Sequence, residues 1–522
     1  MKHSVTPTAA RLHRMLLYLA ITGCLVLGGH ARLAAAEWFV PNPAQLSAAL
    51  EKAQPGDRIT MADGTWADQE IEFNARGTAD QPITLGAQTP GQVVLTGKSI
   101  LRVGGRFLVV TGLSFQGGER KPANNNAVVF RSRQGEAEHC RLTECAVVDY
   151  SPADKNISTS YVTVYGRNNR VDHCYFSGKT NRSSVLAVTF APGSPPSHHR
   201  IDHNHFGHRA PFGENGAEAI QVGWSAAQQV DSRTVVEYNY FEAFSGEVEI
   251  ITNKSCGNIY RHNTFVRCEG ALSLRVGDRC VVEGNFFLGR KAPHTGGVHV
   301  FGEDHRIVNN YFEGLSGTRE KLGVQSGSGA AIVLMNGSSL VSTGEPRVLE
   351  FPTGGRLHPQ VKRAVVAFNT FVDCTSMIDI GVAFPPFDTV SNLRASDCVL
   401  ANNLVVGVPA GEIVRLSNVP EDLVCEGNLA GAAGGGPDLP AGFRAIDPHL
   451  ARDAHGIFRS GPGSPVIGAA VDAAPGMHLD GDTQARPGKR QDVGYNHDSA
   501  EAARPGPLTP NQVGPRWLRS PQ

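Results

Sequence analysis

The sequence predicts an all-β protein: a right-handed parallel β-helix with a short N-terminal capping helix and irregular C-terminal coils. Three observations support this prediction. A unit of the form apolar-x-x-Asn-x-Phe recurs, the copies that end at Phe241, Phe265, Phe287 and Phe312 follow one another at nearly equal intervals, and the intervening segments alternate without a helical period. One unit of this length cannot bury its apolar side alone, whereas stacked coils bury a continuous core.

The repeated Asn and Phe predict two columns of stacked side chains. The later copies of the unit end at Phe206, Phe241, Phe265, Phe287, Phe312, Phe371, Val405 and Leu429. Two earlier copies, near Val147 and at Phe176, carry Cys where the later copies carry Asn. We expect the Asn side chains to hydrogen-bond along the stack at a turn, and the Phe rings to stack inside.

Residues 1–36 have the pattern of a secretory signal peptide. A basic start is followed by the apolar stretch 15–29, and Ala34–Ala36 offers a small-residue cleavage site before Glu37. Two alternatives are lipoprotein processing at Cys24 and an uncleaved membrane anchor. We therefore expect an exported protein, periplasmic or secreted, with no membrane span after signal cleavage.

Composition divides the rest of the chain into two parts. Residues 37–430 carry the repeat and form the expected β-helix domain, while residues 431–522, rich in Pro, Gly and Ala, are expected to form irregular coils or a cap. Within the first part, the Gly- and Ser-rich residues 314–360 predict a long loop inserted between two coils.

The start of the repeat domain carries a helix signal. Residues 41–66 predict a short helix followed by the first strand, with Asn42 or Ser47 as the helix cap. A helix across the open end of a β-helix would protect the edges of its first strands.

Charge and cysteine content narrow the function classes. Lys plus Arg total 48 and Asp plus Glu total 49, a net charge of −1 that argues against a dedicated nucleic-acid binder. No C-x-x-C spacing occurs, which argues against a zinc site. Nine of the ten cysteines remain after signal removal, so at least one is unpaired, and a bridge between Cys256 and Cys280 on adjacent coils is geometrically allowed.

Two glutamates at alternate positions mark a candidate site. Glu247 and Glu249 would lie on one face of a strand, where carboxylates this close need a cation or a shared proton. Asn215, one coil earlier, adds a neutral oxygen. Oxygen ligands of this kind suit Ca²⁺. The alternative is a solvated glutamate pair on a strand edge.

Two basic residues are placed to act beside such a cation. Lys254 and Arg275 are separated by about one coil and can stack on the same face. Removal of the C5 proton of a uronate requires that the adjacent carboxylate be neutralised, which Ca²⁺ achieves as a Lewis acid. A lysine beside other cations has a lowered pKa and can act as the base, and the arginine can stabilise charge or protonate the leaving O4. The alternative is charge balance with the two glutamates.

The segment GEVEIITNKS, followed about one coil later by the Arg of LRVGD, resembles polysaccharide lyase family 6, which contains alginate lyases and chondroitinase B. Similar segments, in the same order, are NGAEAI, RHNTF, VEGNFFLG, FGEDHRIVNNYFEGLSG and PLTPNQVGPRWL, so the resemblance spans roughly residues 38–518. It implies a right-handed parallel β-helix. It also implies that Asn215, Glu247 and Glu249 are the Ca²⁺ ligands. Lys254 would be the Brønsted base and Arg275 the Brønsted acid.

The sequence departs from this family at its expected sugar contacts. Val276 follows the arginine where alginate-type members usually have His, and His299 lies in GGVHV where members often have Arg. His299 is expected to replace that Arg as a carboxylate contact, with an ordinary surface histidine as the alternative. Glu218 and Gln221, three and six residues after Asn215, are expected to support the ligands or to bind sugar.

The resemblance implies an exported polysaccharide lyase that cleaves a polyuronate by Ca²⁺-assisted β-elimination and leaves a 4,5-unsaturated uronate end. Alginate, as poly-β-D-mannuronate, is the expected substrate and partner, and a dermatan- or chondroitin-type glycosaminoglycan is the second. The alternatives from other classes are a C5-epimerase, which shares the proton abstraction, a non-catalytic polysaccharide-binding β-helix, and a hydrolase, which would need clustered Asp and Glu but no Lys–Arg pair.

Overall fold

The computed structural model describes Met1 and residues 35–118, 126–317, 329–340, 358–383, 389–431, 439–472, 474, 491–495 and 506–519. The chain divides into two compact units, Met1–Ala35 and Ala36–Gln522. The expected signal peptide lies almost entirely outside the described residues, and the second unit holds every described helix and strand. Among the described residues, no helix is long and apolar enough to cross a bilayer.

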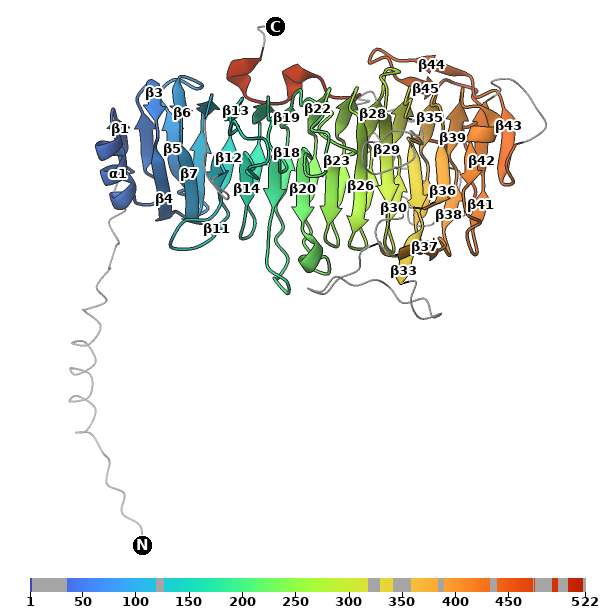
Figure 1. Cartoon of the computed structure of the whole chain (residues 1–522), viewed down its shortest axis with the longest axis horizontal. Coiled ribbons are helices and arrows are strands. Elements are labelled where there is room, and N and C mark those ends of the chain that lie inside the picture. Colours follow the sequence, from blue (N-terminus) through green and yellow to red (C-terminus); the bar gives the residue numbers. More distant parts are fainter. Residues whose placement is uncertain are drawn as a thin grey trace. The chain divides into compact units, whose positions relative to one another are not determined.

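Three long parallel sheets form the second unit and confirm the predicted parallel β-helix (Figure 1). A typical coil adds one strand to sheet 1, the next to sheet 2 and the third to sheet 3, so that residues about one coil apart in sequence become neighbours across a sheet.

Sheet 1 contains β1 (Glu37–Val40), β2 (Arg58–Met61), β5 (Ile83–Ala87), β8 (Leu108–Thr111), β12 (Arg141–Thr143), β15 (Arg170–Asp172), β18 (Arg200–Asp202), β21 (Val235–Glu237), β24 (Ile259–Arg261), β27 (Val281–Glu283), β30 (Arg306–Val308), β34 (Val365–Ala367), β38 (Val399–Ala401) and β41 (Val424–Glu426). Sheet 2 contains β3 (Gly64–Ala67), β6 (Val93–Thr96), β9 (Leu113–Gln116), β13 (Ala146–Val148), β16 (Tyr175–Ser177), β19 (His205–Phe206), β22 (Tyr240–Glu242), β25 (Thr264–Val266), β28 (Phe286–Leu288), β31 (Tyr311–Glu313), β35 (Thr370–Val372), β39 (Leu404–Val406), β42 (Asn428–Gly431) and β43 (Phe443–Ile446). Sheet 3 contains β4 (Glu70–Arg76), β7 (Ile100–Arg106), β10 (Val128–Val129), β11 (Ala137–Glu138), β14 (Val162–Val164), β17 (Leu186–Val188), β20 (Ile220–Gly223), β23 (Glu249–Lys254), β26 (Gly270–Val276), β29 (Thr295–Val300), β32 (Ile332–Met335), β36 (Ile378–Val382) and β40 (Val414–Leu416).

The other described elements are the helix α1 (Pro43–Lys52), the 3₁₀ helices η1 (Ser225–Ala227), η2 (Ala410–Glu412), η3 (Pro510–Gln512) and η4 (Arg516–Leu518), and the antiparallel pairs β33 (Gly337–Leu340) with β37 (Thr389–Leu393) and β44 (Leu450–Arg452) with β45 (Phe458–Ser460).

The N-terminal helix has the cap that the sequence offers. Asn42 Oδ1 accepts a hydrogen bond from Gln45 N at 3.0 Å, Pro43 occupies the first turn, and Ser47 lies inside the helix. The prediction that the helix precedes the first strand is wrong, because β1 comes before it and pairs in parallel with β2. This strand has only four residues, too few for its alternation to be recognised in the sequence.

A ladder of buried asparagines joins the coils at the turn between sheets 1 and 2 and confirms the predicted Asn column. The backbone N–H of each Asn donates to Oδ1 of the next at 2.9–3.0 Å, along Asn204, Asn239, Asn263, Asn285, Asn310, Asn369, Asn403 and Asn428. Cys174 continues the column, because its N–H donates to Asn204 Oδ1 at 3.0 Å. The residue before every one of these asparagines has a positive φ, so the ladder also holds the tight turn of each coil.

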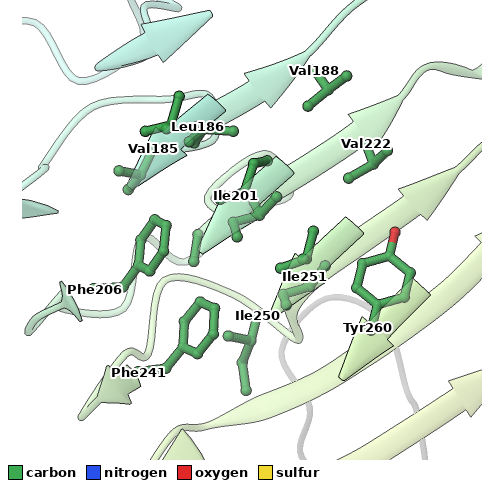
Figure 2. Close-up of a cluster of buried hydrophobic side chains, with 14 of the residues drawn as sticks. Val185, Leu186, Val188, Ile201, Phe206, Val222, Phe241, Ile250, Ile251 and Tyr260 are labelled. Carbon is green, nitrogen blue, oxygen red and sulfur yellow. The ribbon is translucent and has the colours of Figure 1, made fainter. Parts of the chain in front are cut away.

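The Phe column is also confirmed. Stacked rings with centroids 4.6–4.9 Å apart connect Phe206, Phe241, Phe265, Phe287, Phe312 and Phe371. Figure 2 shows the first two of these rings in one buried cluster with aliphatic side chains of sheet 3, among them Val222 and Ile251. The core therefore runs continuously inside the coils.

The described cysteines are all free thiols. Cys256 and Cys280, for which a bridge was allowed, instead donate to backbone carbonyls: Cys256 Sγ to Gln228 O at 3.2 Å, and Cys280 Sγ to Ser255 O at 3.5 Å. Burial raises the pKa of Cys280 to about 12, which makes this thiol a poor nucleophile.

The predicted loop over residues 314–360 is wrong in part. Strand β32 is a full member of sheet 3 between β29 and β36, and β33 pairs with β37. A short apolar run between Gly- and Ser-rich stretches forms β32, and the average composition conceals it. Residues 318–328 and 341–357 lie outside the described residues.

The C-terminal segment 506–519, here called the strap, runs back along earlier coils. Leu508 N donates to Thr264 Oγ1, Gly514 N to His203 O, and Trp517 Nε1 to Glu144 O, each at 2.8 Å. Figure 1 shows its 3₁₀ helices, in red, beside β13, β19 and β22. The strap therefore links coils that are far apart in the stack.

Replacing Asn263 with Ala tests the ladder. The change removes the acceptor of the Asn239 N–H and of Asn239 Nδ2, and the donor to Val236 O and to Asn285 Oδ1. Asn239 Nδ2 and Asn285 Oδ1 keep other partners, so the main loss falls on the Asn239 N–H and Val236 O. Each unsatisfied group costs about 1–3 kcal/mol, and we expect the free energy of unfolding to fall by about 2–4 kcal/mol. Urea unfolding followed by circular dichroism measures this loss.

Asn156→Ala is the control, because this side chain is exposed and outside the ladder. Equal losses of stability in the two variants would show that the ladder contributes nothing beyond an ordinary Asn.

Candidate active site

The candidate site lies on the outer face of sheet 3, where β20, β23, β26 and β29 are adjacent. Parallel register places Gln221 opposite Thr252, Thr252 opposite Ser273, and Ser273 opposite His299. The residues flanking these positions, such as Ile220 and Val222, belong to the core. Side chains alternate along a strand, so this row points outward.

Three carboxylates meet at the start of these strands. Glu218 precedes β20, Glu247 precedes β23, and Glu249 is the first residue of β23. One oxygen of each lies within 4.8 Å of the others. The predicted pair Glu247 and Glu249 is therefore joined by Glu218, for which the sequence predicts a supporting or sugar-binding role.

A β-bulge places Glu249 at this cluster. Between β23 and β26 the register shifts, with Glu249 opposite Ala271 but Ile251 opposite Leu272. Ile250 is the extra residue, and Figure 2 shows both Ile250 and Ile251 in the core. The bulge thus breaks the simple alternation and leaves Glu249 outside the core.

The loop that carries Asn215 is fastened to Glu247. The backbone N–H groups of Gly216 and Ala217 both donate to Glu247 Oε1 at 3.0 Å. A side chain at Gly246 would meet Ala217 O at 2.0 Å, so glycine is required for this close approach. Asn215 itself is exposed, directly before the two donors.

The electrostatics of the cluster fit a divalent cation. Burial raises the pKa of Glu218; the charge of Lys254 opposes that rise and the charge of Glu249 adds to it. Burial, Glu218 and Glu249 likewise raise the pKa of Glu247. Glu218 Oε2 is buried without a hydrogen-bond partner. Three close carboxylates with an unsatisfied oxygen are costly by themselves, whereas hard oxygen ligands are what Ca²⁺ prefers.

Two buried basic side chains, which were not predicted from the sequence, lie behind the carboxylates. Arg209 Nη1 donates to Glu218 O at 3.3 Å and its Nη2 to Asn181 O at 2.7 Å, and Lys179 Nζ donates to Asn181 O at 2.9 Å. Burial and then the charge of Arg209 lower the pKa of Lys179 well below its usual range. The repeat could have indicated that both residues are buried. Each lies three residues after a repeat Phe, at the position that Cys268 occupies in a later coil.

Lys254 and Arg275 are brought together as predicted. Lys254 is the last residue of β23 and pairs with Gly223 on one side and Val276 on the other. A second register shift makes Arg275 the extra residue of β26, and its Nε lies 4.0 Å from Glu249 Oε1. Burial lowers the pKa of Arg275, and the charges of Glu249 and Glu247 oppose this change.

The residues at the expected sugar contacts, Gln221, His299 and Val276, differ in how far they are exposed. Gln221 is partly exposed in the outward row, and its Nε2 donates to Gly223 O at 2.9 Å. His299 lies in the same row but is only 6% exposed, so it is not an ordinary surface histidine. Val276 is 2% exposed and places an apolar side chain next to Lys254.

Known proteins share this architecture. The family model of chondroitinase B matches residues 40–415. The PL6 family alginate lyase AlyGC is 32% identical, with a TM-score of 0.77, over 93% of this chain and 59% of its own, so this chain spans about three fifths of AlyGC. A mannuronic acid specific family 6 lyase from human gut microbiota is 27% identical, with a TM-score of 0.66, over 79% of this chain and 91% of its own.

A further solved structure is the family 6 lyase Pedsa3628 from Pseudopedobacter saltans, 25% identical with a TM-score of 0.66 over 78% of this chain and 95% of its own. None of the curated proteins matches this chain. The chondroitinase B model covers most of the sequence, and the likeness to AlyGC extends over nearly all of it. This chain therefore belongs to the chondroitinase B family, polysaccharide lyase family 6.

Proposed function

We propose that the protein is an exported lyase that cleaves alginate, with poly-β-D-mannuronate as the preferred polymer. One observation carries the proposal: three carboxylates, Lys254 and Arg275 meet on one outer face of sheet 3. The mannuronic acid specificity of the gut-microbiota lyase supports the choice of polymer. The predicted signal peptide supports export.

The reaction is a β-elimination across C4 and C5 of a uronate. Lys254 Nζ removes the C5 proton, the electron pair of that bond forms the C4–C5 double bond, and the C4–O4 bond breaks. Arg275 donates a proton to O4 of the leaving sugar. Its Nε lies 4.0 Å from Glu249 Oε1, and this charge attraction favours the same placement of the donor before substrate binds.

Asn215, Glu247 and Glu249 would hold Ca²⁺, with Glu218 as a fourth oxygen donor. Bound Ca²⁺ supplies neutralisation of the uronate carboxylate beside C5, which acidifies that proton. We assign Glu218 to the cation and not to sugar, because its side chain is buried toward the other two carboxylates. Arg209, behind Glu218, partly balances the negative charge.

Gln221 and His299 are the proposed sugar contacts. Both lie in the outward row. Along the strands, the carboxylates come before this row, and Lys254 and Arg275 come after it. A second substrate, dermatan-type glycosaminoglycan, has one observation in its favour: the matching family model is that of chondroitinase B.

Replacing Lys254 with Ala tests the elimination. Loss of the general base is expected to lower kcat by about 10²–10⁴-fold. The measurement is the absorbance of unsaturated uronate ends released from polymannuronate, polyguluronate and dermatan sulfate in the presence of Ca²⁺.

Lys98→Ala is the matched control, because this lysine is exposed and far from the site along the chain. Full activity in Lys254→Ala, or activity lost equally in both variants, would contradict the proposed base. A signal on dermatan sulfate alone would favour the second substrate.

Replacing Glu218 with Gln tests the cation site. The variant removes one of three converging carboxylates, and we expect its Ca²⁺ affinity to fall at least about tenfold. In the unmodified protein, we expect chelation to abolish activity and added Ca²⁺ to restore it. Isothermal titration with Ca²⁺ measures the affinity.

Glu214→Gln is the comparison, because Glu214 is an exposed neighbour of Asn215 that pairs with Arg182. Unchanged affinity in Glu218→Gln would return Glu218 to a role outside the cation site.

A further inference from the structure

Arg275 contacts an aromatic ring as well as a carboxylate. Its Cζ lies 5.4 Å from the centroid of the Phe301 ring, which directly follows β29 and is 2% exposed. A guanidinium over an aromatic face is attracted by the ring, more strongly where water is excluded. Glu249 and Phe301 therefore hold the guanidinium by two different interactions.

A histidine from the 314–360 stretch supports that ring. The imidazole of His358 stacks on Phe301 with centroids 5.3 Å apart and an interplanar angle of 29°. Ser338 fastens His358 from β33: Ser338 N donates to His358 O at 3.0 Å, and Ser338 Oγ lies 3.2 Å from His358 Nδ1. The histidine is fully buried.

Apolar side chains pack around Phe301. Phe301 packs in a separate cluster with Ala330, Val333, Met335 and Val382, which covers the outer face of sheet 3 beyond His299. The strands that carry this cluster, β32 and β36, are fully paired members of the sheet. Phe301 is therefore held by the fold, and the imidazole of His358 stacks on its ring.

His358 is suited to stand near a cation. Burial, and then the charge of Arg275, lower the pKa of His358 to about 3, so the ring is neutral at any pH at which the protein would act. A neutral imidazole does not repel the guanidinium. Phe301 is only 2% exposed, so the attraction between its ring and Arg275 acts where little water is present.

We propose that His358, through Phe301, is a positioning residue that holds the Arg275 guanidinium in place to protonate the leaving O4. The residue after Arg275 is Val276 and not a histidine. The imidazole near this arginine is that of His358, which lies far downstream in the chain. The proposal rests on the proposed lyase function. It gives the inserted stretch a role in catalysis although His358 itself does not touch substrate.

The test compares His358→Ala, His358→Phe and unmodified protein in steady-state cleavage of polymannuronate, per folded molecule. Misplacing a catalytic group by about 1 Å can cost about 10²-fold, and we expect His358→Ala to lower kcat by about 10–100-fold with KM within about twofold. His358→Phe keeps a planar ring on Phe301 and is expected to retain kcat within about threefold of the unmodified protein.

His199→Ala is the matched control. His199 is equally buried, burial lowers its pKa also to about 3, and its Nδ1 accepts from the backbone N–H of Asn169. We expect it to lower the melting temperature without changing kcat per folded molecule.

Three results would overturn the inference alone: unchanged kcat in His358→Ala, a parallel change of kcat and KM, or a loss in His358→Phe as large as in His358→Ala. Absence of elimination by the unmodified protein would overturn the lyase function and this role together, so the two failures are distinguishable.

Discussion

The asparagine ladder is the interaction on which the rest of the structure depends. Each Asn Oδ1 accepts the backbone N–H of the Asn one coil before it, and the preceding residue has a positive φ, so the ladder fixes both the turn and the register of successive coils. Once the register is fixed, residues about one coil apart in sequence become neighbours, as with Lys254 and Arg275, or Glu218 and Glu249. The site is therefore a consequence of stacking, and no single segment contains it.

Because the coils are stacked in a fixed register, the fold can also bury ionisable side chains that a less ordered structure would leave in water. Three carboxylates meet at the start of β20 and β23, with Arg209 and Lys179 buried behind them. Removing charges from water is costly unless they are paired, and this arrangement leaves one buried oxygen of Glu218 without a partner. Such a cluster is poised for a cation, because a bound ion satisfies the oxygen and the excess charge together.

The sequence predicted those parts of the structure that the repeat dictates. The Asn and Phe columns, the Asn42 cap, and the proximity of Lys254 to Arg275 follow from periodicity, local capping chemistry and coil length. The parts that it missed are breaks in the periodicity. The bulge at Ile250 cannot be read from alternation, β32 is a short apolar run inside a Gly- and Ser-rich stretch, and the contact of His358 with Phe301 joins residues that no local pattern relates.

The most direct test is a crystal structure of the Lys254→Ala variant with Ca²⁺ and a mannuronate oligosaccharide. We predict one cation bound by Asn215, Glu218, Glu247 and Glu249 and by a uronate carboxylate. C5 of that sugar should face position 254, and O4 should lie within hydrogen-bond reach of Arg275. A cation bound elsewhere, or an oligosaccharide bound away from the outer face of sheet 3, would contradict it.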